Sequence, residues 1–222
     1  MNYSDFLSEL KSIADEKYAA FHRRLLKNDS IRVLGVRAPL LRKIAKAQSC
    51  AFEDVLSFPN EYYEVKFVKL TMIASLPYDA FLPRLFDAVS LIDNWACCDS
   101  FAPKSIAKHK TEFLPVLDKV FTHGGEYFER FALVTLLQNY VAKEYLPILF
   151  SYCNRANTDF YYVHMAVAWL LSEVLVRFPD EGDTFLKEQT LPVKTHNKAI
   201  QKALESFRLT DERKCMLKSL KR

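Results

Sequence analysis

The sequence repeats at intervals of about 33 to 34 residues, and this repeat restricts the fold more than any other feature. Residues 63–68, 128–133 and 162–167 each open with an aromatic residue and continue as an apolar helix. Their starts are 65 and 34 residues apart, and because 65 is nearly twice 33, the segment around Trp95 fills the missing place. The clearest match pairs residues 130–137 with residues 164–171.

A second predicted helix follows in each unit, at residues 78–91, 111–121 and 143–152, with prolines near the boundaries. Stacked helix pairs form a solenoid whose inner helices line a concave surface. The chain contains only 4 Gly, which also favours helices joined by short connections. We therefore predict an all-α fold, an α-α superhelix of HEAT-like repeats, with residues 1–222 forming a single domain. The alternative is a chance similarity between amphipathic helices.

Basic residues are concentrated near a predicted helix start. Apolar spacing over residues 4–27 predicts one or two helices, after which Gly35 permits a turn and Pro39 suits the first turn of a new helix. Four cations occupy this stretch: Arg37, Arg42, Lys43 and Lys46. They indicate either a solvated face or contacts with phosphate groups. The lysine-rich tail from residue 193 reads as two capping helices, which act as a solubilising cap or a phosphate-binding end.

The stretch from residue 92 to Lys104 contains one of the two tryptophans. Trp95 and Asp99 are four residues apart, so on a helix they project side by side. An aromatic plane beside a carboxylate suits a flat cation. The alternative interpretation places Trp95 in the core, with Asp99 as a cap or in solvent.

Several classes of site lack their signatures. Neither a Gly-x-x-x-x-Gly-Lys loop nor a Gly-x-Gly-x-x-Gly motif is present, the five histidines lack metal-ligand spacing, and no nucleophile motif occurs. We therefore expect no cofactor and no metal site. A net charge of +4 permits nucleic-acid binding without requiring it.

The cysteines and the N-terminus bear on the cellular location. The five cysteines are an odd number without a Cys-x-x-Cys pair, and we expect reduced, mostly buried thiols. We find no signal peptide and no uninterrupted apolar stretch of membrane-spanning length. The sequence therefore predicts a cytoplasmic protein without a membrane partner, and nothing in it demands more than a monomer.

Four segments in order carry a resemblance to a known family. They read Leu-Gly-Val-Arg-Ala-Pro-Leu-Leu-Arg-Lys-Ile-Ala-Lys (34–46), Asp-Asn-Trp-Ala-Cys-Cys-Asp-Ser (93–100), Tyr-Phe-Glu-Arg-Phe-Ala (127–132) and Met-Ala-Val-Ala-Trp-Leu-Leu (165–171). Over roughly its whole length, the chain resembles the DNA alkylation repair family, the AlkD-like HEAT-repeat DNA glycosylases. The resemblance implies base excision repair, in which alkylated purines of duplex DNA are removed by hydrolysis of the N-glycosidic bond.

The resemblance also implies site residues. Trp95 and Asp99 fall on the Trp-x-x-x-Asp pair of the family, Arg130 on its arginine, and Trp169 on the tryptophan of a later inner helix. An alkylated purine is already cationic and leaves without a general acid, so Asp99 would stabilise the oxocarbenium ion and hold the attacking water. Trp95 and Trp169 would grip the sugar and backbone beside the lesion, and Arg130 would pair with a phosphate. We therefore predict three catalytic residues, Asp99, Trp95 and Arg130. The predicted DNA-binding residues are Trp169, Arg37, Arg42, Lys43, Lys46 and Lys104.

This chain departs from active members of the family at two places. Ser172 and Glu173 follow Trp169, where active members usually carry a basic residue. The segment Ala96, Cys97 and Cys98 resembles a divergent subgroup whose glycosylase activity is not established. Two alternatives to a glycosylase therefore stay open: a non-catalytic module that binds DNA of unusual structure or a protein partner, and a purely structural role for Trp95 and Asp99, with Asp99 bonded to Arg130.

Overall fold

The computed structural model describes residues 2–26, 28–188 and 190–222, which form two compact units. Unit 1 spans Met1–His109 and unit 2 spans Lys110–Arg222. Within the described ranges the regular structure is helical, apart from an isolated β-bridge between Arg32 and Tyr62. The predicted all-α helical-repeat class is confirmed. That the whole chain forms a single domain remains a prediction.

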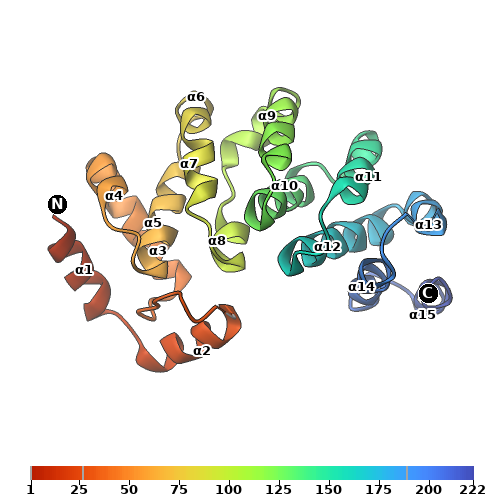
Figure 1. The fold of residues 1–222 in the computed structure, drawn as a ribbon, viewed down its shortest axis with the longest axis horizontal. Coiled ribbons are helices and arrows are strands. Elements are labelled where there is room, and N and C mark those ends of the chain that lie inside the picture. Colours follow the sequence, from red (N-terminus) through yellow and green to blue (C-terminus); the bar gives the residue numbers. More distant parts are fainter. Residues whose placement is uncertain (1, 27, 189) are drawn as a thin grey trace. The chain divides into compact units, whose positions relative to one another are not determined.

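Unit 1 is organised around its most buried helix, α5. The helices of unit 1 are α1 (Tyr3–Ser12), α2 (Glu16–Leu26), α3 (Ala38–Ala47), α4 (Phe52–Ser57), α5 (Tyr63–Ala74), α6 (Tyr78–Phe81), α7 (Leu85–Ser90) and α8 (Trp95–Ser100), with short 3-10 turns η1 (Ser49–Ala51), η2 (Leu82–Arg84) and η3 (Lys104–Lys108). Helix α5 is apolar nearly all round, as a helix enclosed by others must be, and packs against α3, α4 and α8 (Figure 1).

The turn before α3 is fixed by a buried carboxylate. Gly35 adopts a φ of 101°, and a Cβ atom there would lie 2.2 Å from the Asp15 carbonyl oxygen, so only glycine fits. The side chain of Glu64 is fully buried and accepts hydrogen bonds from the backbone N–H groups of Leu34, Gly35 and Val36 at 3.0, 2.8 and 3.2 Å. These bonds tie the entry to α3 onto the first turn of α5.

Unit 2 continues the helical repeat. Its helices are α9 (Lys110–His123), α10 (Glu126–Asn139), α11 (Leu146–Arg155), α12 (Tyr161–Arg177), α13 (Pro179–Lys187), α14 (Val193–Leu204) and α15 (Asp211–Ser219), with a 3-10 turn η4 (Lys143–Tyr145) before α11. Helix α12 packs between α10 and α14 and also against α13 (Figure 1). The helices α5, α8, α10, α12 and α14 start at residues 63, 95, 126, 161 and 193, so their starts are 32, 31, 35 and 32 residues apart.

The predicted second helices are found with altered boundaries. The stretch expected as one helix over residues 78–91 is divided into α6, η2 and α7. Pro83 lies inside η2 and lacks the N–H group that a continuous α-helix would use there. The tail forms the two predicted helices, α14 and α15, and residues 4–27 contain the two helices α1 and α2.

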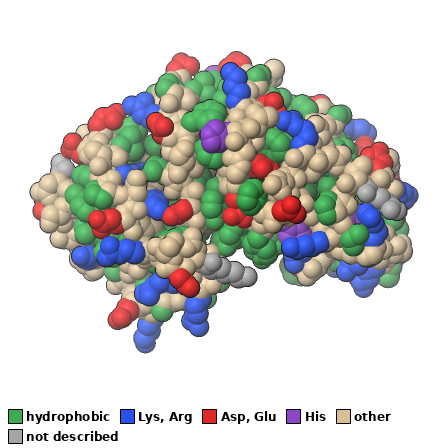
Figure 2. Space-filling model, viewed as in Figure 1, with side chains coloured by type: hydrophobic (Ala, Val, Ile, Leu, Met, Phe, Trp, Pro, Cys, Tyr) green, Lys and Arg blue, Asp and Glu red, His purple; other side chains and the backbone are tan. Residues whose placement is uncertain are grey.

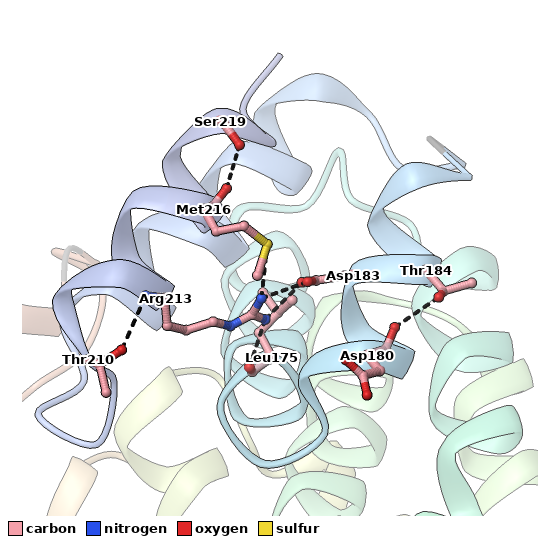
Figure 3. A network of polar contacts seen from close by, with 8 residues as sticks. All are labelled: Leu175, Asp180, Asp183, Thr184, Thr210, Arg213, Met216 and Ser219. Atoms are coloured by element: carbon pink, nitrogen blue, oxygen red, sulfur yellow. Dashed lines mark hydrogen bonds and ion pairs between the residues drawn. The ribbon is translucent and has the colours of Figure 1, made fainter.

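A buried ion pair fastens α15 to the rest of unit 2 (Figure 3). Arg213 donates to both carboxylate oxygens of Asp183, at 2.6 and 2.8 Å, and to the Leu175 carbonyl oxygen at 3.2 Å. The side chains of Arg213 and Asp183 are only 13% and 11% exposed. The bidentate pair therefore joins α15 to α13 and α12 at a protected position.

Candidate nucleic-acid interface

Helix α8 owes its position to Asn94, the residue before it. The fully buried Asn94 side chain accepts a hydrogen bond from the Cys97 N–H at 2.8 Å, which caps the helix. Its amide nitrogen donates to Asp93 at 2.8 Å, and Asp93 in turn pairs with Lys66 of α5. The cap fixes Trp95 as the first residue of α8.

Trp95 and Asp99 lie on the partly exposed side of α8. Both are half-buried, whereas Ala96, Cys97 and Cys98 between them face the core. The Trp95 indole N–H donates to the Leu25 carbonyl oxygen at 3.1 Å, so the end of α2 orients the ring. The predicted common face of Trp95 and Asp99 is therefore present in unit 1, while their functional roles remain predictions.

The cysteines of α8 serve packing. Burial raises the pKa of the Cys97 thiol to about 12, which suppresses its reactive thiolate form. Cys97, Cys98 and Cys153 are buried, whereas Cys50 and Cys215 are exposed. The prediction of mostly buried thiols is confirmed.

The predicted basic stretch lies along α3 and its N-cap. Arg37 lies over the Tyr18 ring, with 4.5 Å from Cζ to the ring centroid, and pairs with Asp15 at 3.4 Å. The pKa of the Asp15 carboxyl is lowered, first by the Tyr18 N–H and then, against the effect of burial, by Arg37. Arg42 lies over the Phe67 ring of α5 at 5.5 Å.

The remaining predicted cations of unit 1 are exposed. Lys43 and Lys46 lie on the surface of α3, and Lys104 lies at the start of η3. Figure 2 shows lysine and arginine side chains over α2, which contains the exposed Arg23 and Arg24. The Arg37 contacts are internal to unit 1, whereas the lysines can reach a polyanion.

Arg130 of unit 2 is buried rather than presented to solvent. Only 5% of the residue is exposed, and its guanidinium donates to the Tyr162 carbonyl oxygen at 2.7 Å. Glu126 accepts from the Tyr162 N–H at 2.8 Å, and Glu129 accepts from the Asn157 N–H at 2.7 Å. The first five residues of α10 therefore hold the start of α12 through two polar contacts and the segment before it through a third.

Trp169 belongs to the exposed side of α12. It is 37% exposed, and Tyr161 and Met165 precede it at intervals of four residues on the same face. One turn further on, Glu173 pairs with Arg208 at 2.6 Å. The sequence of α12 has Ser172 and Glu173 after Trp169, where active family members usually carry a basic residue. In this structure Arg208, from the segment after α14, places a guanidinium group beside Glu173.

The structure groups the predicted site residues by unit. Trp95 and Asp99 share one face of α8, whereas in unit 2 Arg130 is buried and Trp169 is exposed. The sequence interpretation assigned no role to Asn94 and did not foresee the pairing of Arg208 with Glu173. An asparagine directly before a predicted helix is a cap signal, but nothing local connects Arg208 with a residue 35 positions away.

Two further observations concern ligands and membranes. Within the described ranges, no three His, Cys, Asp or Glu side chains gather closely enough to hold a metal ion. In the same part of the chain, no helix is both long and apolar enough to cross a bilayer.

Comparison with known proteins adds the family. The profile described as DNA alkylation repair enzyme matches residues 6–207, which covers most of both units. No curated protein matches the chain. The match and the all-α repeat agree with the resemblance that the four sequence segments carry. The chain belongs to the DNA alkylation repair enzyme family, and its role lies in DNA repair.

Proposed function

We propose that the protein is a DNA glycosylase that hydrolyses the N-glycosidic bond of alkylated purines, of the 3-methyladenine and 7-methylguanine type, in duplex DNA. The observation that supports this most is the pairing of half-exposed Trp95 and Asp99 on α8, with the core-facing residues between them. A carboxylate that remains accessible beside an aromatic face can meet a cationic sugar and its leaving base.

The proposed chemistry needs few groups. An alkylated purine carries a positive charge, so the glycosidic bond breaks without protonation of the base, and positive charge develops on the sugar. The Asp99 carboxylate stabilises this charge and orients the water that attacks C1′. The Trp95 indole, held by the Leu25 carbonyl oxygen, supplies a fixed surface for the sugar.

Unit 2 has a binding role in this proposal. Trp169 contacts the DNA backbone from the exposed side of α12. The bond from Arg130 to the Tyr162 carbonyl oxygen supports a positioning role, because it sets the start of the helix that carries Trp169. The contact of Arg130 with a DNA phosphate remains a prediction.

Product analysis tests the proposal. Wild-type protein is incubated with duplex DNA that contains one 7-methylguanine, and free base and abasic sites are measured together. For wild type, we expect one abasic site for each free base released. The control Asp87→Asn, which changes an exposed residue of unit 1, should give the same amounts as wild type. Asp99→Asn should release at least about 10²-fold less base, the usual effect of a lost electrostatic stabiliser. Intact DNA after incubation with folded wild type would exclude a glycosylase.

A second candidate function is a non-catalytic module that binds DNA. The burial of Arg130 favours it, since one of the three predicted catalytic side chains is committed to the α10–α12 contact. This module would bind duplex DNA with a steep salt dependence, because each neutralised phosphate adds about 0.9 to the slope. Binding that weakens steeply with salt concentration, without release of base, would favour this candidate. A salt dependence near zero would exclude both functions.

A further inference from the structure

A basic pocket lies between α12 and α14 in unit 2, on the side of the chain's last residues. Its volume is about 360 Å³. Lys194, Lys198 and Lys221 contribute three ammonium groups, Asn197 and Gln201 contribute amides, and Tyr161 contributes an aromatic ring. The Tyr161 ring is 46% exposed.

The side chains that line this pocket carry positive charge and no negative charge. None of the described residues that line it is acidic, and none of its three lysines forms an ion pair with a described residue. The buried lining residue His164 is affected by these lysines. Its pKa is lowered by burial first, and then by the charges of Lys194 and Lys198. Three neighbouring lysine side chains favour a bound anion.

The fold holds the third lysine in place. The His196 ring donates to the Leu220 carbonyl oxygen at 2.8 Å, and the Arg222 side chain donates to the Leu191 carbonyl oxygen at 3.2 Å. Asn197 exchanges two further bonds with the Arg222 backbone, at 2.6 and 3.0 Å. Lys221 lies between these anchored residues, so its backbone is held beside the start of α14.

The donors present match one ligand group. A phosphate accepts hydrogen bonds from ammonium groups, and an aromatic ring in the same pocket can cover the adjoining sugar or base. We propose that this pocket binds a phosphate group of a DNA strand, with Tyr161 against the neighbouring nucleoside. This inference rests on the proposed DNA-binding function and adds an anchoring point in unit 2.

Matched double variants test the pocket. Lys194→Gln with Lys198→Gln removes two pocket cations, and Lys119→Gln with Lys187→Gln removes the same charge from the exposed sides of α9 and α13. Fluorescence anisotropy with a labelled duplex gives the salt dependence of binding. The pocket variant should lose about 1 from the slope, corresponding to one phosphate, while the control keeps the wild-type slope. Equal slopes for the two variants would overturn the proposal.

Two nicked duplexes distinguish the source of the phosphate. One carries a 5′-phosphate at the nick and the other a 5′-hydroxyl. A terminal phosphate has a charge of about −1.5 to −2 and an internal one has −1. If the pocket binds the terminal phosphate of a strand, wild type binds the duplex with the 5′-phosphate more tightly than the one with the 5′-hydroxyl, and the pocket variant binds both equally. If it takes an internal phosphate, wild type binds both nicks equally and the slope difference remains.

A titration with inorganic phosphate separates this inference from the proposed function. NMR chemical shifts of the backbone amides of residues 193–201 should move in wild type and stay fixed in the pocket variant. Shifts without DNA binding would support the pocket and contradict the glycosylase. DNA binding and base release in wild type, with the pocket variant indistinguishable from the control, would contradict the pocket alone.

Discussion

The two units use charged side chains of the predicted site in opposite ways. In unit 1, Asp99 lies half-exposed on α8, beside a tryptophan that the end of α2 orients. In unit 2, Arg130 is buried and bonded to the Tyr162 carbonyl oxygen. The family resemblance nominated both side chains as site residues, but only the packing shows that Asp99 is half-exposed and that Arg130 holds two helices together.

The largest effect is expected at the Arg213–Asp183 ion pair of unit 2. The stability lost with this pair gives a reference value for charged side chains that hold helices together. Arg213→Ala leaves Asp183 buried without its guanidinium, and should lower the free energy of unfolding by about 3–5 kcal/mol. Urea unfolding followed by circular dichroism measures this loss. The control Lys143→Ala removes an exposed pair with Glu181 and should cost under about 1 kcal/mol. Similar losses in the two variants would contradict the structural role of the Arg213 pair.

Arg130→Ala tests whether this arginine also acts as a structural charge. The variant leaves the Tyr162 carbonyl oxygen without its guanidinium donor, and we expect a loss of about 2–3 kcal/mol in the same assay. Arg130→Lys keeps one donor and should recover part of the loss. If Arg130→Ala were as stable as wild type, Arg130 would not hold α10 and α12 together. The difference in role between Arg130 and Asp99 would then be contradicted.

Asn94→Ala tests how α8 is held in unit 1. Loss of the cap to the Cys97 N–H should cost about 1–2 kcal/mol, and Asn94→Ser, which can still cap, should cost less. Because the cap sets the first residue of α8, base release should fall in Asn94→Ala at temperatures where the protein remains folded. Unchanged release together with unchanged stability would show that the cap does not position Trp95 and Asp99.

The smallest effect concerns His164 in unit 2. Because its folded-state pKa is lowered, by burial first and then by Lys194 and Lys198, protonation favours the unfolded state. Its contribution to stability is complete above the ordinary value of 6.5 and is lost as the pH falls through the lowered pKa. The wild type should therefore lose more stability than His164→Gln as the pH falls below 6.5. Parallel curves of unfolding free energy against pH for wild type and His164→Gln would contradict this direction.

Local patterns predict much of this architecture. The apolar periodicity predicts α10 and α12, Pro39 predicts the start of α3, and the four-residue spacing predicts the common face of Trp95 and Asp99. These features depend on residues within one or two turns of each other, where helix geometry is regular.

Other features depend on residues that are far apart in the sequence. The burial of Arg130 follows from the Tyr162 carbonyl oxygen 32 residues away, and the role of Glu64 follows from N–H groups about 30 residues earlier. The position of Lys221 likewise requires the bonds between α14 and the last residues. No local pattern encodes such contacts, because they form only when neighbouring repeats stack.

The most direct test of the central claim separates chemistry from binding at Asp99. Single-turnover release of 7-methylguanine is measured at saturating protein, together with the Kd for the same duplex, for Asp99→Asn and the control Asp87→Asn. Our account predicts that the Asp99→Asn rate falls by about 10²-fold or more while its Kd and stability stay near wild type. A rate equal to that of Asp87→Asn would contradict the account and remove Asp99 from the chemistry.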